Sequence, residues 1–194
     1  ITSVIAAMTP MFVFHGVRTF VFVPKSQLAN QAAMEILHAV VEGNPSTLSA
    51  QAGQPIRGLR YAARSASSSA IWFARADQLG YWASDNRRVL IRLDGELIKR
   101  SFPVDGTCPP PAPSEEEIVP YEAANRLRIT TPVQSLFRYY NQNGQEIFPA
   151  LPGCVSGSSI RRVDVAFVAQ TGGGSFDQSD AQVRAQSSVA IRFP

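Results

Sequence analysis

The sequence is poor in the residues that build metal centres and nucleic-acid surfaces. It has two cysteines and two histidines among 194 residues, which nearly excludes a structural zinc cluster. Lysine occurs only twice, and the 18 basic side chains are spread thinly along the chain. Because nucleic-acid binding needs basic side chains gathered into a patch or stripe, no nucleic-acid partner is predicted.

Charged residues are also scarce. They make up 17% of the chain, below the typical share of about 25%. Hydrophobic residues account for an ordinary 45%. Disordered chains are rich in charge and poor in aromatic residues, so wholesale disorder is excluded. The length fits one domain with an appendage.

The sequence lacks the common catalytic motifs. It contains no G-x-S-x-G, no G-x-x-x-x-G-K-[ST] and no H-E-x-x-H. His15 and His38 lie on segments expected to be helical, and nothing pairs them with a nucleophile and an orienting acid. The sequence therefore predicts a protein that is not an enzyme and has no cofactor and no metal site.

The first 23 residues are strongly apolar. Fifteen of them are hydrophobic, and Arg18 is the only one with a formal charge. A helix of this length would be about 35 Å long, enough to cross a bilayer core. No basic leader or small-residue cleavage site precedes it. We therefore expect a mature chain or a fragment that begins inside an apolar helix.

Residues 25–42 continue this helix in amphipathic form. Gly43-Asn44-Pro45 follows, with glycine just past the expected helix end and proline after it. The sequence thus predicts one N-terminal helix over residues 1–42, with an apolar half at 1–23. The apolar stripe of the second half is spaced for one helical face and comprises Leu28, Ala32, Ile36, Ala39 and Val40, widened by Met34, Leu37 and Val41.

Short strand-like segments dominate residues 43–194, the expected β-rich head. Two alternating segments flank Asp94-Gly95, a strong hairpin signal. The Pro-rich residues 105–120 predict a stiff connection rather than a strand, and Glu115, Glu116 and Glu117 within it predict a solvated face. The expected strands lie at 56–62, 70–75, 79–83, 89–93, 96–102, 127–131, 136–140, 145–148, 161–170 and 187–193.

A helix followed by strands implies an α+β fold, with a long N-terminal helix packed on a C-terminal antiparallel sheet. This layout resembles the type IV filament superfamily, the pilins and pseudopilins. The resemblance rests on ITSVIAAMTP at the start, on AAMEILHAVVEG followed by PIRGLRYA, and on the ending IRRVDVAFVAQ, a loop and SSVAIRF.

The resemblance implies a structural subunit of an extracellular filament. Copies of the chain would associate through the apolar helix, after an inner-membrane precursor stage that requires an assembly machinery. Heterologous contacts that do not close generate such fibres. The residues expected in the assembly helix are Ile1, Val4, Ile5, Met8, Pro10, Phe12, Phe14, Val17, Phe20 and Phe22.

Cys108 and Cys154 are the only cysteines. Exported heads of the resembled family often carry one disulfide, which implies that these two residues pair. An oxidising compartment would permit this bond. Two unpaired thiols in a cytosolic protein are the alternative.

Two other functions stay open. The chain could be a minor pilin or a type II secretion pseudopilin that primes a short fibre. It could instead be a single-pass membrane-anchored protein whose β-domain binds a glycan or a partner. In that case Trp72, Phe73, Tyr81 and Trp82 would form the binding face, although aromatic strand residues are more often core.

Overall fold

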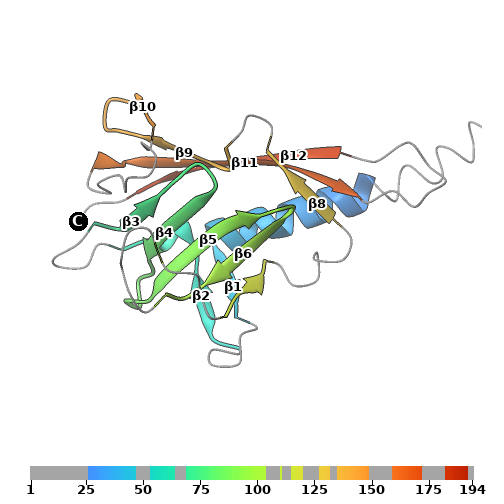
Figure 1. Ribbon diagram of the computed structural model, residues 1–194, viewed down its shortest axis with the longest axis horizontal. Helices are drawn as coiled ribbons and strands as arrows, with labels where there is room; N and C mark the ends of the chain where they lie inside the picture. Colours follow the sequence, from blue (N-terminus) through green and yellow to red (C-terminus); the bar gives the residue numbers. More distant parts are fainter. Residues whose placement is uncertain are drawn as a thin grey trace, which may run out of the picture.

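The computed structural model shows a chain built mainly from β-strands (Figure 1). Strands make up 53% and helices 18% of the residues that the structure describes. The structure describes residues 26–46, 53–63, 69–103, 110, 115–119, 127–131, 135–148, 159–171 and 182–191.

The strands form two five-stranded antiparallel sheets and one small ribbon. One sheet has the order β3-β4-β5-β6-β7, a simple meander. The other has the order β10-β9-β11-β12, with β8 also paired to β11. The ribbon joins β1 to β2. The bounds are β1 Gly43–Pro45, β2 Pro55–Arg57, β3 Ile71–Ala74, β4 Gln78–Trp82, β5 Arg88–Asp94, β6 Leu97–Ser101, β7 Glu117–Ile118, β8 Leu127–Thr130, β9 Phe137–Tyr140, β10 Glu146–Ile147, β11 Arg162–Thr171 and β12 Gln182–Ala190.

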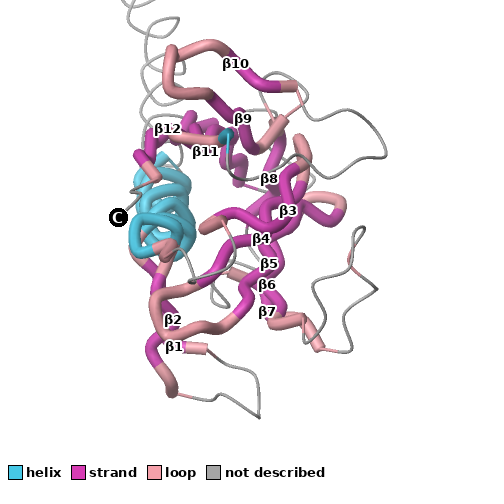
Figure 2. Tube along the Cα trace, turned by 90° about the vertical axis from the view of Figure 1, so that its left-hand side faces the viewer, coloured by secondary structure: helices cyan, strands magenta, loops and turns pink. Residues whose placement is uncertain are grey.

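One helix, residues 26–41, lies in the angle between the two large sheets (Figure 2). Its buried face is rich in small side chains, which lets the helix approach the sheets closely. Leu28 and Met34 are exposed, 37% and 57% respectively, so their expected place in the apolar stripe is wrong. The buried helix residues are Ala29, Ala32, Ala33, Ile36, Ala39, Val40 and Val41.

The helix and both large sheets share one apolar core. β11 shows the alternation most clearly, since Val163, Val165 and Phe167 are fully buried while their neighbours are half-buried. Backbone hydrogen bonds also link the sheets. The amide of Ile129 donates to the carbonyl of Glu96 at 2.9 Å, and the amide of Leu136 donates to that of Ala76 at 2.8 Å. The two sheets are therefore parts of one folded unit.

Most expected strands are present. The hairpin joins β5 to β6, with Asp94 opposite Leu97 and Gly95 at φ +61°. β12 starts at Gln182, five residues before the expected strand. The Pro-rich connection was expected to contain no strand, which is wrong for Glu117–Ile118, because these residues pair with β6 as β7.

The expected fold class is wrong. The sequence predicted a long N-terminal helix packed on a sheet, whereas the described chain is mostly β with a single helix of about 16 residues. Within the described residues, the helical periodicity of residues 25–42 produces a helix over 26–41. Residues 1–25, which include every residue of the expected assembly helix, lie outside the described part.

Two glycines permit a close crossing just after the helix. Gly43 has φ +98°, and a Cβ there would lie 1.9 Å from the carbonyl oxygen of Ile56. A Cβ on Gly58 would lie 2.5 Å from the carbonyl of Val41. The amide of Gly58 donates to the carbonyl of Glu42 at 2.9 Å. The helix end thus contacts the β2 segment backbone to backbone.

We expect Gly43→Ala to destabilise the protein far more than Gly53→Ala. Both glycines have positive φ, so both variants carry the left-handed backbone cost of about 1–2 kcal/mol. Only Gly43 would also force its Cβ into backbone, whereas nothing lies within 4 Å of a Cβ on Gly53. Overpacking of this kind adds about 1–3 kcal/mol. Urea unfolding measures the difference, and equal losses would contradict the close crossing.

Candidate functional site

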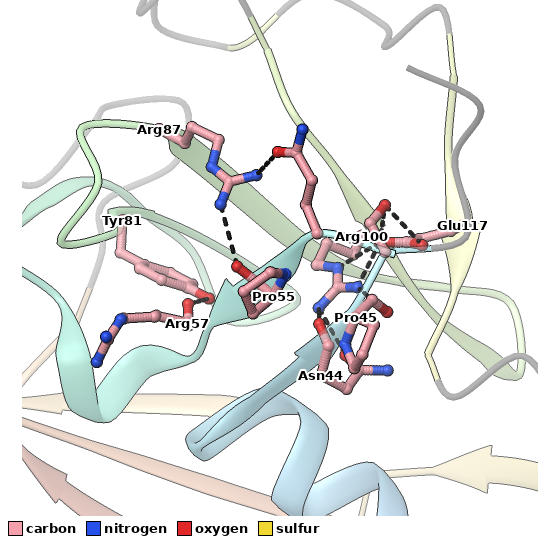
Figure 3. Close-up of polar contacts among 10 residues, drawn as sticks. Asn44, Pro45, Pro55, Arg57, Tyr81, Arg87, Arg100 and Glu117 are labelled. Atoms are coloured by element: carbon pink, nitrogen blue, oxygen red, sulfur yellow. Dashed lines mark hydrogen bonds and ion pairs between the residues drawn. The ribbon is translucent and has the colours of Figure 1, made fainter. Parts of the chain in front are cut away.

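The most elaborate polar cluster of the described residues is buried between β1, β6 and β7 (Figure 3). Arg100 and Glu117 are opposite each other in the β6–β7 register. Their side chains are only 2% and 3% exposed. Nε and Nη2 of Arg100 each lie 2.5 Å from Oε1 of Glu117. Paired charges of this kind are the usual form in which a full charge is buried.

The remaining polar atoms of this pair reach the segment that follows the helix. Nη1 of Arg100 donates to Oδ1 of Asn44 at 2.7 Å. The hydroxyl of Ser46 lies 3.2 Å from both carboxylate oxygens of Glu117. We call Arg100, Glu117, Asn44 and Ser46 the Arg100 cluster. It attaches β1, and with it the end of the helix, to the β3–β7 sheet.

The geometry of the Arg100 cluster is structural rather than catalytic. Its guanidinium and carboxylate are engaged with each other, and its neighbours supply an amide and a hydroxyl. Such an arrangement fixes backbone segments relative to one another, since breaking one partner leaves a buried charge uncompensated. It was missed from the sequence, where Glu117 was expected on a solvated face together with Glu115 and Glu116.

A second charged group lies on the opposite face of the same sheet. Nη2 of Arg92 donates to Oε2 of Glu116 at 2.6 Å, and Nζ of Lys99 lies 2.5 Å from Oδ2 of Asp94. The hydrogen bond from Lys99 holds the pKa of Asp94 below its usual value. This group is partly exposed, so each pair contributes only about 0–1 kcal/mol. Glu116, just before β7, and Glu117, its first residue, therefore serve opposite faces of the β3–β7 sheet.

We expect Arg100→Met to reduce the free energy of unfolding by about 3–5 kcal/mol, because Glu117 would stay buried without its partner. The double variant Arg100→Met/Glu117→Leu should be more stable than Arg100→Met alone. Lys99→Met, one position away on the partly exposed face, is the matched control and should cost about 0–1 kcal/mol. Urea unfolding of all three measures this. A loss in Arg100→Met no larger than in Lys99→Met would contradict the buried pair.

Two tyrosines are fully buried and donate to backbone carbonyls. The hydroxyl of Tyr81 lies 3.1 Å from the carbonyl oxygen of Arg57. That of Tyr139 lies 2.7 Å from the carbonyl oxygen of Arg75 and so joins β9 to the other large sheet. Burial raises the pKa of both tyrosines well above the ordinary value of 10.0. Both hydroxyls thus stay protonated hydrogen-bond donors in the folded state.

The raised pKa of these tyrosines predicts a loss of stability in alkali. Above pH 10 the unfolded chain loses these protons while the folded chain keeps them, so stability is full below that pH and falls as pH rises. Each group contributes a slope of about 1.4 kcal/mol per pH unit. Tyr139→Phe should make the slope shallower by about that amount in urea unfolding. An unchanged slope would contradict the burial of Tyr139, and Tyr61→Phe, at an exposed ring, is the control.

Of the four aromatic residues considered as a binding face, Trp72 and Trp82 are half-buried. Phe73 and Tyr81 are buried. The indole N–H of Trp72 donates to the carbonyl of Tyr81 at 3.1 Å, and a Cβ on Gly80 would lie 2.6 Å from the Trp72 ring. Arg88 covers the Trp82 ring at 4.7 Å. These contacts make the aromatic residues part of the packing of β3 and β4.

The outer face of β9, β11 and β12 is polar and half-exposed. The guanidinium of Arg162 stacks on the ring of Tyr140 at 3.9 Å. Its Nε lies 3.1 Å from Oδ1 of Asp164, which also accepts from the hydroxyl of Ser188 at 2.6 Å. This face presents side chains that are already hydrogen-bonded to one another.

Other predicted site residues cannot be placed. Cys108 and Cys154 lie outside the described residues, as do Ile1 to Phe22. Within the described ranges, no group of three or more His, Cys, Asp or Glu side chains could hold a metal ion. The same ranges contain no helix with the length and apolar character of a bilayer crossing.

No family model, curated protein or solved structure matches this chain. The expected membership of the type IV filament superfamily is wrong, because no family matches and the described chain is mostly β with one short helix. The quoted segments carried only a layout, a long helix before strands, whereas the described chain has a single helix of about 16 residues.

Proposed function

We propose that the chain is a non-catalytic structural subunit of an extracellular filament. Copies of the chain associate through the apolar residues 1–23, and the β-rich part forms the outer surface. The precursor is held in the membrane by the same residues until an assembly machinery incorporates it.

The composition of residues 1–23 is the observation that carries the proposal. Fifteen of 23 side chains are hydrophobic and one is charged. Burying each phenylalanine of this segment among neighbouring copies contributes about 1.5–3 kcal/mol. The described residues meanwhile form a core of their own from the helix and both sheets. The chain thus combines a folded β-rich part with an apolar segment suited to association.

The described charged clusters support a structural role. The Arg100 cluster joins β1 to the β3–β7 sheet, and Tyr139 joins the two sheets. The outer pairs Arg92–Glu116 and Lys99–Asp94 compensate one another on the surface. These groups hold elements together, which is what a subunit under repeated contact with its neighbours requires.

We expect Phe14→Asp and Phe20→Asp to abolish fibres while the β-rich part stays folded, because a carboxylate cannot be buried among apolar side chains without a partner. Phe148→Asp makes the same chemical change at a side chain that is 78% exposed, and this control should form fibres normally. Electron microscopy of high-speed pellets measures fibres, and near-ultraviolet circular dichroism checks the fold.

Normal fibres from the Phe14 and Phe20 variants would contradict the proposal. A wild-type chain that stays with detergent-soluble membrane and never pellets as a fibre would instead identify the membrane-anchored binding protein. The abundance of the chain in sheared fibres separates a main building block from a subunit that only primes assembly.

A further inference from the structure

β12 is a long edge strand, unlike the edge strands β3, β7 and β10 of the large sheets. Natural sheets protect their edges with very short strands, bulges, prolines or charges. β7 and β10 have only two residues each, and β3 has a register shift between Ile71 and Phe73. β12 has nine residues, no proline, no lysine and a single charge, Arg184. Figure 2 shows it at the margin of its sheet, beyond β11.

β12 is held in a regular, extended form along its whole length. Its register with β11 runs without a shift from Gln170 opposite Gln182 to Arg162 opposite Ala190. Among the described strands it pairs with β11 alone. Its core-facing side includes buried Ala185 and Val189, and the alternate residues are exposed. A strand in this state can accept another strand by adding to the sheet.

We propose that β12 pairs antiparallel with β12 of a second copy, about a two-fold axis at Gln186. A contact of this kind is self-complementary and closes after two subunits. It joins the two β10-β9-β11-β12 sheets into one continuous sheet across the pair. The contact is separate from the association through residues 1–23 and does not depend on it.

The sequence of β12 suits this register. With the axis at Gln186, residue 183 faces residue 189 of the other copy, so Val183 meets Val189 on the core-facing side. Gln186 faces Gln186 of the other copy, and the two amide side chains can hydrogen-bond to each other across the axis. Arg184 faces Ser188, so the one charge of the strand does not meet itself.

The charges next to the edge are complementary in this register as well. Ser188 is opposite Asp164 on β11, and the two side chains are hydrogen-bonded at 2.6 Å. Arg184 of the second copy therefore lies in the same row as Asp164, one strand beyond Ser188. Neighbouring strands lie about 4.8 Å apart, so about 9.6 Å separates the two backbones. The pairing thus places each Arg184 in the same row as an acidic group, two strands away.

The decisive experiment changes the residue on the axis. In Gln186→Lys two like charges face each other, and in Gln186→Glu they do so again, so each variant alone should associate about tenfold more weakly than wild type or worse. An equal mixture of the two variants should regain association, because unlike charges then face each other. Gln182→Lys, an exposed residue of the same strand that faces Ala190 instead of itself, is the matched control.

Association is measured on the full chain in detergent, which covers the apolar segment, by sedimentation equilibrium over a range of protein concentrations. We expect wild type and Gln182→Lys each to form dimers. Each Gln186 variant alone should dimerise more weakly, and the equal mixture of the two Gln186 variants should regain the dimer. A monomeric wild type, a Gln186→Lys variant as dimeric as wild type, an equal effect of Gln182→Lys, or no recovery in the mixture would overturn the proposal.

The outcome is distinguishable from that of the filament proposal. If the chain forms a dimer in detergent but no fibres, the β12 pairing is supported and the filament proposal is contradicted. If the chain forms fibres and its Gln186 variants associate in detergent as wild type does, the filament proposal is supported and the β12 pairing is contradicted.

Discussion

The burial of one guanidinium determines how the end of the helix meets the β3–β7 sheet. Arg100 lies on the core-facing side of β6, where a charge without a partner would be very costly. It is compensated by Glu117 from β7 and by the side-chain oxygen of Asn44 from β1. Two strands that are far apart in the sequence must therefore be present at the same time. This requirement links the end of the helix to a strand within the Pro-rich connection.

The glycine crossing and the buried tyrosines also fix how the helix and the sheets are arranged. Gly43 and Gly58 bring two backbones together where any side chain would clash. Tyr139 adds a hydrogen bond between the two sheets. Apolar burial supplies most of the stability of such a unit, but it is not directional. The polar contacts and the glycines select one arrangement of the helix and sheets among many apolar packings.

Sequence reasoning predicted the strands well and the architecture poorly. The alternation in residues 161–170 and the Asp94-Gly95 turn are local signals. The structure has β11 at the first and the β5–β6 hairpin at the second. The predicted long helix was wrong for the described residues, where the helical period of residues 25–42 produces one helix of about 16 residues. The Arg100 cluster was not predictable, because nothing local distinguishes Glu117 from Glu116. Its only signal was the alternation of β6, which places Arg100 on the same face as Ile98.

Glu116, just before β7, and Glu117, its first residue, constrain how the chain can change in evolution. Glu116 and Glu117 are adjacent, yet one serves the outer surface and the other the core. A shift of β7 by one residue against β6 would exchange the two faces, so that Glu116 or Ile118 would replace Glu117 opposite Arg100. A register shift by an even number of residues keeps each side chain on its face, and a shift by an odd number exchanges the faces. This constraint acts on the spacing of residues and is independent of their overall composition.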